Sequence, residues 1–344
     1  MKIFRLRFFV ALACLIIINS SNAVVLEGRV LSDFPEAVCN SGAPASVFFK
    51  KGASGRLALL ISGGGGARSG SGYLRRIGIA ERYTGSDLTR SMVADLGYQT
   101  YDQKAALFEF FDQRGDSIIW LPYCSSDVFM GNHTHQINGV EVPFKGQKIF
   151  EAVIQTFGKE INEAKQWVIG GFSAGSIAIG ANLKLIHQIN HPNVALIFDG
   201  YWLNESELAF RKKISPSNAT LAFISKGLPQ DCESWATCYP SRERIEKYGM
   251  KRAFITWNPG DHYRLTKADQ PMMDETEKDI ELFGGGITVS RQTVLTARIG
   301  NNNTAHCVLF TDAFHQVIDG QSVANVFAHW LDKTGGKTAI VRKD

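Results

Sequence analysis

Short apolar runs that alternate with longer amphipathic stretches are the feature of this sequence that most restricts its fold. Each run has five to seven residues, is apolar on both faces and is bounded by turn residues, as expected for a strand that is covered on both sides. The runs are Arg56–Ser62, Ser117–Tyr123, Gln166–Gly171, Val194–Phe198, Leu221–Ser225 and Ala253–Trp257. Between them, Gln147–Lys165 and Ser176–Ile189 carry apolar residues at helical spacing. The sequence therefore predicts an α/β fold with a mostly parallel central sheet, helices on both faces and sites at the carboxyl ends of the strands.

The first 23 residues have the composition of a secretory signal peptide. A basic start with three cations precedes the apolar stretch Phe8–Ile18, and Ser21–Ala23 has the small-residue spacing that signal peptidase accepts. The apolar stretch is too short to span a bilayer comfortably. We therefore expect cleavage near Ala23, a secreted or periplasmic protein, and no stable membrane anchor.

The charge balance argues against a nucleic-acid partner. The chain has 37 Lys and Arg against 33 Asp and Glu, and the leader alone carries three of those cations, which leaves 34 against 33. No long basic run follows the leader. No linker, charge block or repeat divides residues 24–344 either, so we expect them to form a single domain.

Five cysteines follow the leader, and in an exported chain they are candidates for disulfides. Cys232 and Cys238 lie close together in QDCESWATCYP and could close a local loop. The odd number leaves at least one thiol without a partner in the chain. No C-x-x-C pair occurs, so we expect no metal site, and we expect no cofactor.

A run of four glycines in LLISGGGGARSGSG follows the first predicted strand. A phosphate-binding Walker A loop would need a lysine, which this stretch lacks. A dinucleotide fingerprint that begins at Gly63 or Gly64 would place Arg68 or Ser69 where the third glycine belongs. The remaining roles are a plain turn, or a loop whose backbone amides approach a reacting carbonyl.

The motif G-x-S-x-G occurs once in the context that it requires. Gly171–Gly175 reads GFSAG and lies between a predicted strand and a predicted helix, so Ser173 is a candidate nucleophile at a tight strand-to-helix turn. The backbone N–H of Ala174 would then donate to the oxyanion of a tetrahedral intermediate. The glycine loop after the first strand is the expected source of the other donors.

These motifs and their neighbours resemble the pectin acetylesterase and Notum family of secreted α/β-hydrolase-type carboxylesterases. Leu121–Phe129 (LPYCSSDVF) is a nearly intact match to the family's LPYCSSD, and GFSAG matches its serine motif. Further matching segments are Ala37–Ser41 (AVCNS), Phe198–Leu203 (FDGYWL), Thr304–Cys307 (TAHC) and Phe327–Lys333 (FAHWLDK). The resemblance runs from about Cys39 to Leu331, so residues 24–344 are expected to be one α/β-hydrolase-like catalytic domain.

The resemblance implies a Ser-Asp-His triad. It makes Ser173 the nucleophile, Asp261 in ITWNPGD the acid and His306 the base, in the chain order that an α/β-hydrolase fold has. It also implies an oxyanion hole, whose donors would be the amides of Gly65, Gly66 and Ala174.

Two alternatives stay open for the triad, because Asp199 also follows a strand and His315 in DAFHQV is a second candidate base. Asp127, in LPYCSSD, is expected to shape the pocket or to anchor a loop.

The chain departs from the family pattern at the glycine loop. The family usually continues as GGGWC, whereas this chain has Gly66, Ala67 and Arg68, so it lacks both the bulky aromatic and the partner cysteine. The family's disulfide pattern therefore does not carry over directly. We expect the pairs Cys39–Cys124 and Cys232–Cys238, with Cys307 left over, and an altered mouth of the pocket.

The resemblance implies a secreted serine carboxylesterase that hydrolyses an O-acyl ester, such as an O-acetyl group of a polysaccharide. The expected partner is an acylated carbohydrate or another ester substrate. A Notum-like deacylase of a fatty-acyl ester and a non-catalytic, glycan- or ligand-binding member of the same fold are the alternatives. The sequence leaves the acyl chain length, the leaving group and the oligomeric state open.

Overall fold

The computed structural model describes most of the chain after the leader. It covers residues 24, 26–67, 106–214, 227–258, 261, 270–288, 306–318, 320–333 and 338–341 of the 344. The leader, the predicted strand Leu221–Ser225 and Arg68 lie outside the described residues.

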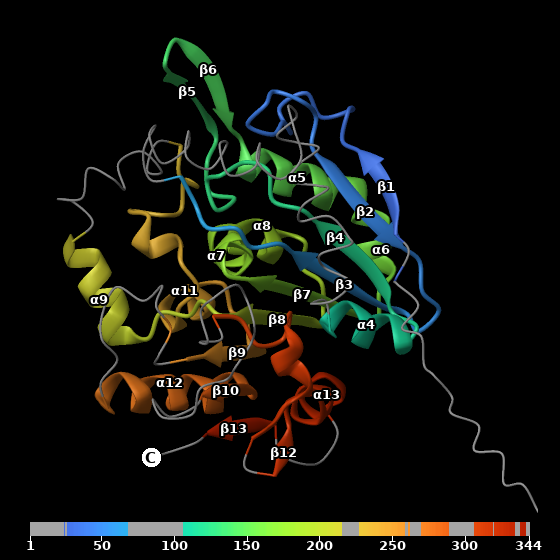
Figure 1. Cartoon of the computed structure of the whole chain (residues 1–344), viewed down its shortest axis with the longest axis vertical. Coiled ribbons are helices and arrows are strands. Elements are labelled where there is room, and N and C mark those ends of the chain that lie inside the picture. The colour runs from blue at the N-terminus through green and yellow to red at the C-terminus, as the bar shows by residue number, and fades with distance from the viewer. Residues whose placement is uncertain are drawn as a thin grey trace, which may run out of the picture.

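A nine-stranded sheet forms the centre of the molecule (Figure 1), in the order β1-β2-β4-β3-β7-β8-β9-β10-β13. The parallel part consists of β4 (Ser117–Leu121), β3 (Arg56–Ile61), β7 (Gln166–Phe172), β8 (Val194–Asp199), β9 (Ala253–Trp257), β10 (Gly286–Thr288) and β13 (Ala339–Val341). At one edge, β2 (Ser46–Lys50) pairs antiparallel with both β4 and β1 (Glu27–Val30). The predicted α/β fold with a mostly parallel sheet is confirmed.

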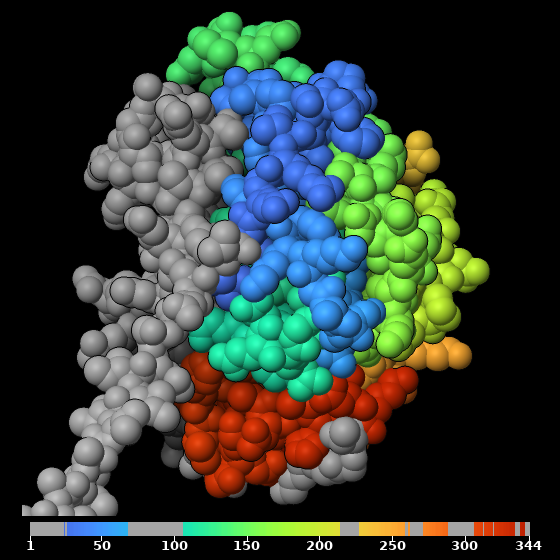
Figure 2. Space-filling model, turned by 90° about the vertical axis from the view of Figure 1, so that its right-hand side faces the viewer, coloured from blue at the N-terminus to red at the C-terminus, as the bar shows by residue number. Residues whose placement is uncertain are grey.

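Each face of the sheet has its own apolar core, because successive residues of a strand point to opposite sides. On one face, Leu59 and Ile169 lie in the core formed with α5 (Gly146–Thr156), α6 (Gly158–Glu163), α7 (Ala174–Ala181), α8 (Leu183–Gln188) and α12 (Gln270–Phe283). On the other face, Leu60 and Val168 lie in the core formed with α4 (Ala106–Gln113), α13 (Val323–Asp332) and the short 3₁₀ helix η3 (Asp312–His315). Figure 2 shows the side of the molecule where β1 and β2 (blue), α4 (teal) and the segment around α13 (red) lie next to one another.

The remaining elements are short. They are the hairpin of β5 (His133–Ile137) and β6 (Val140–Phe144), α9 (Glu205–Ile214), the 3₁₀ helix η2 (Ala236–Cys238), α11 (Arg242–Lys247), and the ribbon of β11 (Val317–Ile318) and β12 (Gln321–Ser322). The β5–β6 hairpin projects from the body of the molecule (Figure 1). No helix in the described part of the chain is long and apolar enough to cross a bilayer.

The two helices that the sequence predicts are each interrupted. Gln147–Lys165 becomes α5 and α6, which meet at Phe157, and Ser176–Ile189 falls within α7 and α8, which meet at Asn182. At the second interruption, the Asn182 amide donates to the carbonyls of Ala178 (2.9 Å) and Phe129 (3.2 Å). An asparagine that bonds to the backbone in this way competes with continuation of the helix.

The disulfides are the expected ones, Cys39–Cys124 and Cys232–Cys238, and Cys307 is a free buried thiol. Burial raises the pKa of the Cys307 thiol well above its usual value, so it stays protonated and unreactive. The first disulfide spans 85 residues and the second spans 6. By loop-closure entropy the first stabilises the fold by about 4–5 kcal/mol and the second by about 2 kcal/mol.

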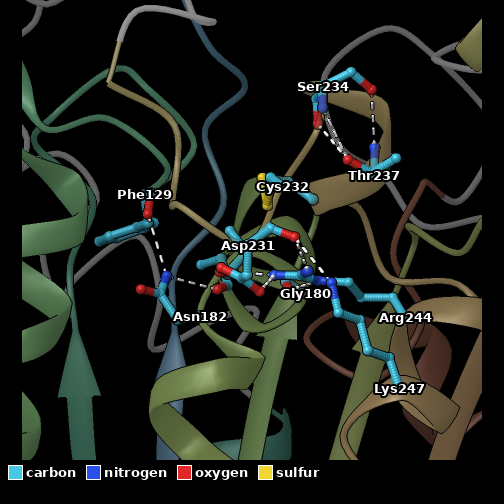
Figure 3. The surroundings of a disulfide bond; sticks show 12 residues. Phe129, Gly180, Asn182, Asp231, Cys232, Ser234, Thr237, Arg244 and Lys247 are labelled. Atoms are coloured by element: carbon cyan, nitrogen blue, oxygen red, sulfur yellow. Dashed lines mark hydrogen bonds and ion pairs between the residues drawn. A yellow bond between two sulfur atoms is a disulfide. The ribbon is translucent and has the colours of Figure 1, made fainter.

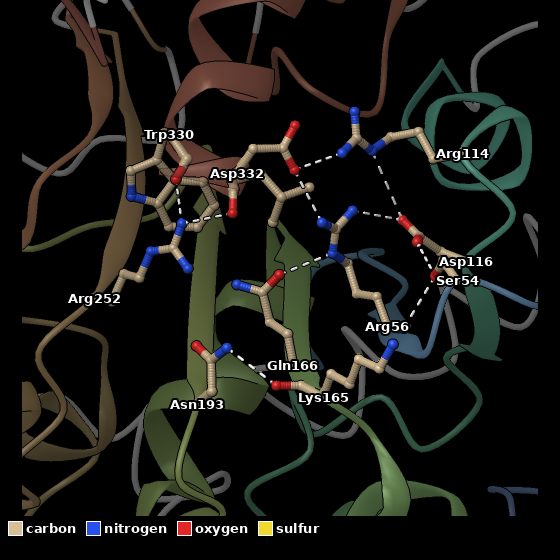
Figure 4. Close-up of polar contacts among 11 residues, drawn as sticks. Ser54, Arg56, Arg114, Asp116, Lys165, Gln166, Asn193, Arg252, Trp330 and Asp332 are labelled. Carbon is tan, nitrogen blue, oxygen red and sulfur yellow. Dashed lines mark hydrogen bonds and ion pairs between the residues drawn. The ribbon is translucent and has the colours of Figure 1, made fainter. Parts of the chain in front are cut away.

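A charged network ties the amino ends of the central strands together (Figure 4). Arg56, at the start of β3, donates to Gln166 (2.8 Å), Asp116 (3.0 Å) and Asp332 (2.9 Å), and Arg114 donates to Asp332 (2.5 Å). These contacts join β3, β7, the start of β4 and the end of α13. They lie at the opposite end of the strands from the carboxyl edge, where a site is expected.

Candidate active site

Ser173 occupies a sharp turn between β7 and α7, as the G-x-S-x-G motif predicts. Its φ of +52° and ψ of −117° lie outside the regions that serine normally adopts, which is the strained geometry of a nucleophile elbow. The two glycines are required by close packing. A Cβ on Gly171 would lie 2.2 Å from the carbonyl of Gly175, and a Cβ on Gly175 would lie 2.2 Å from the Ile61 oxygen at the end of β3.

The glycine loop lies directly beside this elbow. Strands β3 and β7 are parallel neighbours with Ile61 opposite Gly171, so the loops that follow them leave the sheet at the same edge. A Cβ on Gly63 would lie 2.7 Å from the Phe172 ring, and Gly65 has a φ of +68°. Glycine is therefore needed both for the close approach and for the turn.

The expected oxyanion donors are on these two loops. Gly65 and Gly66 follow β3, and Ala174 is the buried first residue of α7. Trp120 Nε1 donates to Ser62 Oγ at 2.7 Å, which anchors the residue directly before the glycine loop. Ala67, which follows the four glycines, is buried in a small apolar cluster with residues of the β5–β6 hairpin, and its N–H donates to the Ser126 carbonyl at 2.7 Å.

Three side chains from distant parts of the chain form one hydrogen-bonded series at this edge. His306 Nε2 lies 2.8 Å from Ser173 Oγ, and His306 Nδ1 lies 2.5 Å from Asp261 Oδ2. Asp261 and His306 are buried, whereas Ser173 is half-buried. When Nδ1 carries the proton and donates it to the carboxylate, Nε2 is free to accept the serine proton. The arrangement can activate Ser173 as a nucleophile.

The two alternative triad residues have other surroundings. Asp199, the last residue of β8, accepts hydrogen bonds from Thr256 and from three backbone amides that begin at Val308. His315 is exposed in η3, where its ring packs on Phe314. His306 Nδ1 lies at hydrogen-bonding distance from the Asp261 carboxylate, and Ser173 Oγ lies at hydrogen-bonding distance from the His306 ring.

Asp127 is a fully buried carboxylate that anchors the LPYCSSD loop. It accepts hydrogen bonds from Ser125 Oγ (2.5 Å) and from the backbone amides of Phe129 (3.0 Å) and Gly146 (2.8 Å). A Cβ on Gly146 would lie 2.3 Å from the carboxylate, so glycine is needed there. Burial raises the pKa of Asp127 to about 6, although its hydrogen bonds act in the opposite direction.

We expect Asp127 to make the folded protein more stable at mildly acidic than at neutral pH. In the unfolded chain its pKa is about 3.9, so as the pH falls through 6 the folded state takes up a proton before the unfolded state does. The cost of the buried charge is thereby removed, and the free energy of unfolding rises by about 2 kcal/mol between pH 7.5 and pH 4.

Urea denaturation of wild type and Asp127→Asn at these two pH values measures this contribution. Asp279, whose pKa burial also raises to about 6, is present in both proteins, so its contribution cancels in the difference. The stability advantage of wild type over the variant should grow toward acidic pH. A difference that is independent of pH would contradict the assignment.

An aromatic and guanidinium cluster forms a wall beside His306. The Tyr201 ring stands perpendicular to the His306 ring, with centroids 6.0 Å apart, and packs against Tyr239. The Arg211 guanidinium lies over Tyr201, Tyr239 and Trp235 at 5.2–5.7 Å from the ring centroids. Such cation–π contacts hold the rings in place. Sequence reasoning missed this wall, although FDGYWL, one of the resembling segments, contains Tyr201.

A separate polar cleft of about 440 Å³ lies at the other end of α7 from Ser173, between α5, α8 and residues 227–231. Near it, Arg244 donates to the Gly180 carbonyl at 2.9 Å and to Asp231, next to the Cys232–Cys238 disulfide (Figure 3). The residues that line this cleft include no serine, cysteine or histidine.

Comparisons with known proteins agree with this fold. A family model described as Pectinacetylesterase matches residues 20–280. The palmitoleoyl-protein carboxylesterase notum1' of Xenopus laevis is 24% identical over 49% of this chain and 36% of its own length, and NOTUM of Mus musculus is 25% identical over 49% and 34%. The match thus spans about a third of these relatives. The solved structure of the Wnt deacylase Notum from Drosophila superposes with a TM-score of 0.60 at 16% identity, covering 90% of this chain and 93% of that one.

Proposed function

This chain belongs to the pectinacetylesterase family, and on that premise we propose that it is a secreted serine carboxylesterase that hydrolyses an O-acyl ester. The observation that carries the proposal is the pair of hydrogen bonds that His306 makes, with Ser173 Oγ at 2.8 Å and with Asp261 at 2.5 Å. In this proposal Ser173 is the nucleophile, His306 the general base and Asp261 the residue that orients the imidazole.

In the proposed reaction these groups act in two successive steps. Ser173 Oγ attacks the ester carbonyl while its proton passes to His306 Nε2, and the oxyanion accepts hydrogen bonds from the amides of Gly65, Gly66 and Ala174. The intermediate collapses to an acyl-enzyme, and His306 returns the proton to the departing alcohol. Water then attacks the acyl group by the same steps, which releases the acid and restores Ser173.

We assign the acyl group as acetyl and its carrier as a carbohydrate. The support is the family model, whose description names a pectin acetylesterase. The Xenopus and mouse relatives are named for a palmitoleoyl group on a protein, and palmitoleoyl is a much longer acyl chain than acetyl. The length of the acyl group is therefore the property that an assay should vary.

We also propose that the protein is exported and that the chain after the leader forms a single domain. It is supported by the composition of residues 1–23 and by the two disulfides, which persist in oxidising compartments.

The test uses the purified chain after the leader. A fluorophosphonate probe should label Ser173, because Oγ displaces fluoride from phosphorus while His306 takes the proton, and peptide mass spectrometry locates the adduct. Unfolded protein is the control and should remain unlabelled. Hydrolysis of p-nitrophenyl acetate, octanoate and palmitate, together with acetate release from acetylated pectin, then measures the preferred acyl group.

Folded protein that neither takes the label at Ser173 nor hydrolyses any ester would overturn the proposal, in favour of a non-catalytic binding role. Faster turnover of the long-chain esters would retain the reaction and overturn the acetyl assignment.

A further inference from the structure

Asp199 uses every acceptor it has to join the nucleophile elbow to the segment that carries His306. Its backbone oxygen accepts the N–H of Ser173 at 2.8 Å and the hydroxyl of Ser176 at 3.1 Å. Asp199 thus fixes the backbone of the proposed nucleophile through its main chain. Its side chain binds the segment that carries His306.

The carboxylate of Asp199 binds the turn that follows His306. Oδ1 accepts the N–H of Val308 at 2.7 Å, and Oδ2 accepts those of Leu309 at 2.9 Å and Phe310 at 3.2 Å. The Thr256 hydroxyl donates a fourth hydrogen bond, to Oδ1, at 2.5 Å. Hydrogen bonds from N–H groups to a carboxylate are stronger than those to a neutral oxygen, so this turn is tightly held.

Gly200, the residue after Asp199, packs directly against the backbone of His306. Gly200 has a φ of +81°, and a Cβ there would lie 2.2 Å from the His306 carbonyl oxygen and 2.9 Å from Cys307 Sγ. The Gly200 N–H donates to Thr256 Oγ1 at 3.0 Å. The backbone of His306 therefore rests directly on the end of β8, two residues before the turn that Asp199 holds.

We propose that Asp199 is a positioning residue that holds Ser173 and His306 at hydrogen-bonding distance, an inference that rests on the proposed function. It touches neither the substrate nor the reacting atoms. Residues 306–310 belong to no helix or strand of the sheet. The Asp199 carboxylate therefore accepts hydrogen bonds from backbone N–H groups that would bond to a neighbouring strand in a sheet.

The chemistry of the side chain explains why aspartate stands here. Burial raises the pKa of Asp199, while Thr256 and the three amides favour its charged form. An asparagine has the same shape but only one acceptor oxygen. Its NH₂ group would face amide donors and leave buried N–H groups without an acceptor, which destabilises the turn. The turn would then relax, and with it the position of His306.

The test compares Asp199→Asn with Asp116→Asn. Asp116 is an equally buried carboxylate that binds Ser54 and Arg56 at the amino ends of the strands (Figure 4), so its loss affects stability away from the site. Initial rates with p-nitrophenyl acetate give kcat and KM, fluorophosphonate labelling gives the reactivity of Ser173, and urea denaturation gives stability.

We expect Asp199→Asn to lower kcat and the labelling rate about 10- to 100-fold, with KM within about twofold of wild type, because small displacements of catalytic groups have effects of this size. We expect Asp116→Asn to keep kcat within about twofold even where it lowers stability. Unchanged kcat in folded Asp199→Asn would overturn the inference. An inactive wild type would instead overturn the proposed function.

Variants of Thr256 keep the inference testable if Asp199→Asn does not fold. Thr256→Val removes one donor to the carboxylate and one acceptor of Gly200, and Thr256→Ser retains both. We expect Thr256→Val to lower the labelling rate severalfold and Thr256→Ser to restore it. Equal labelling of the two variants would show that this connection does not position the site.

Discussion

Replacing Ser173 with alanine is expected to lower kcat for p-nitrophenyl acetate by about ten thousand to a million fold, the size seen when a serine nucleophile is removed. The oxyanion loop and the imidazole remain in place, but no atom is left to form the acyl-enzyme. Residual hydrolysis would come from water attacking a bound ester. The variant should also fail to take up the fluorophosphonate label.

The fold should tolerate this change. The Ser173 hydroxyl bonds to His306, and alanine can occupy the same turn as well as serine can, so the urea midpoint should stay within a few tenths of a molar of wild type. Ser117→Ala is the matched control, because its hydroxyl accepts the Gly52 N–H at the amino end of β4, far from the elbow. Equal activity in wild type and Ser173→Ala would mean that the nucleophile is wrongly assigned.

Asp261→Asn is expected to lower kcat about ten-thousandfold with little change in KM. The amide NH₂ of asparagine would donate to His306 Nδ1, which moves the imidazole proton to Nε2. Nε2 would then point a hydrogen at Ser173 Oγ and could not accept the serine proton. The imidazole would still be present, so the fall in kcat would be due to its wrong tautomer and not to a missing base.

Initial rates with p-nitrophenyl acetate for Asp261→Asn and Asp199→Asn separate the two carboxylates. The positioning role predicts a far smaller loss for Asp199→Asn than for Asp261→Asn. The reverse order, with Asp261→Asn nearly normal, would make Asp199 the triad acid.

Much of the fold could be predicted because it rests on local patterns. Strands such as Val194–Asp199 and Ala253–Trp257 are apolar on both faces, and only a sheet covered on both sides buries such runs. The edge elements carry no such pattern. β1 is exposed along its whole length and β5 has a single buried residue, Ile137, so each depends on the partner strand with which it pairs.

The interruptions of the helices could not be predicted for a related reason. The apolar spacing continues across Phe157 and Asn182, so periodicity alone indicates one helix where the structure has two. At Asn182 part of the cause is a hydrogen bond to Phe129, which is 53 residues away. Contacts over such distances leave no local signal.

The elbow could be predicted from local sequence because five contiguous residues build it: Gly171 and Gly175 leave room for the turn, and Ser173 lies at its tip. The family resemblance assigned Asp261 as the acid and His306 as the base, and it left Asp199 and His315 as alternatives. The contacts of His306 with Ser173 and Asp261, in contrast, depend on the folded arrangement of the whole chain. The physical reason is that the contacts join residues 45 and 133 positions apart, and these distances depend on how the loops fold back over the end of the sheet.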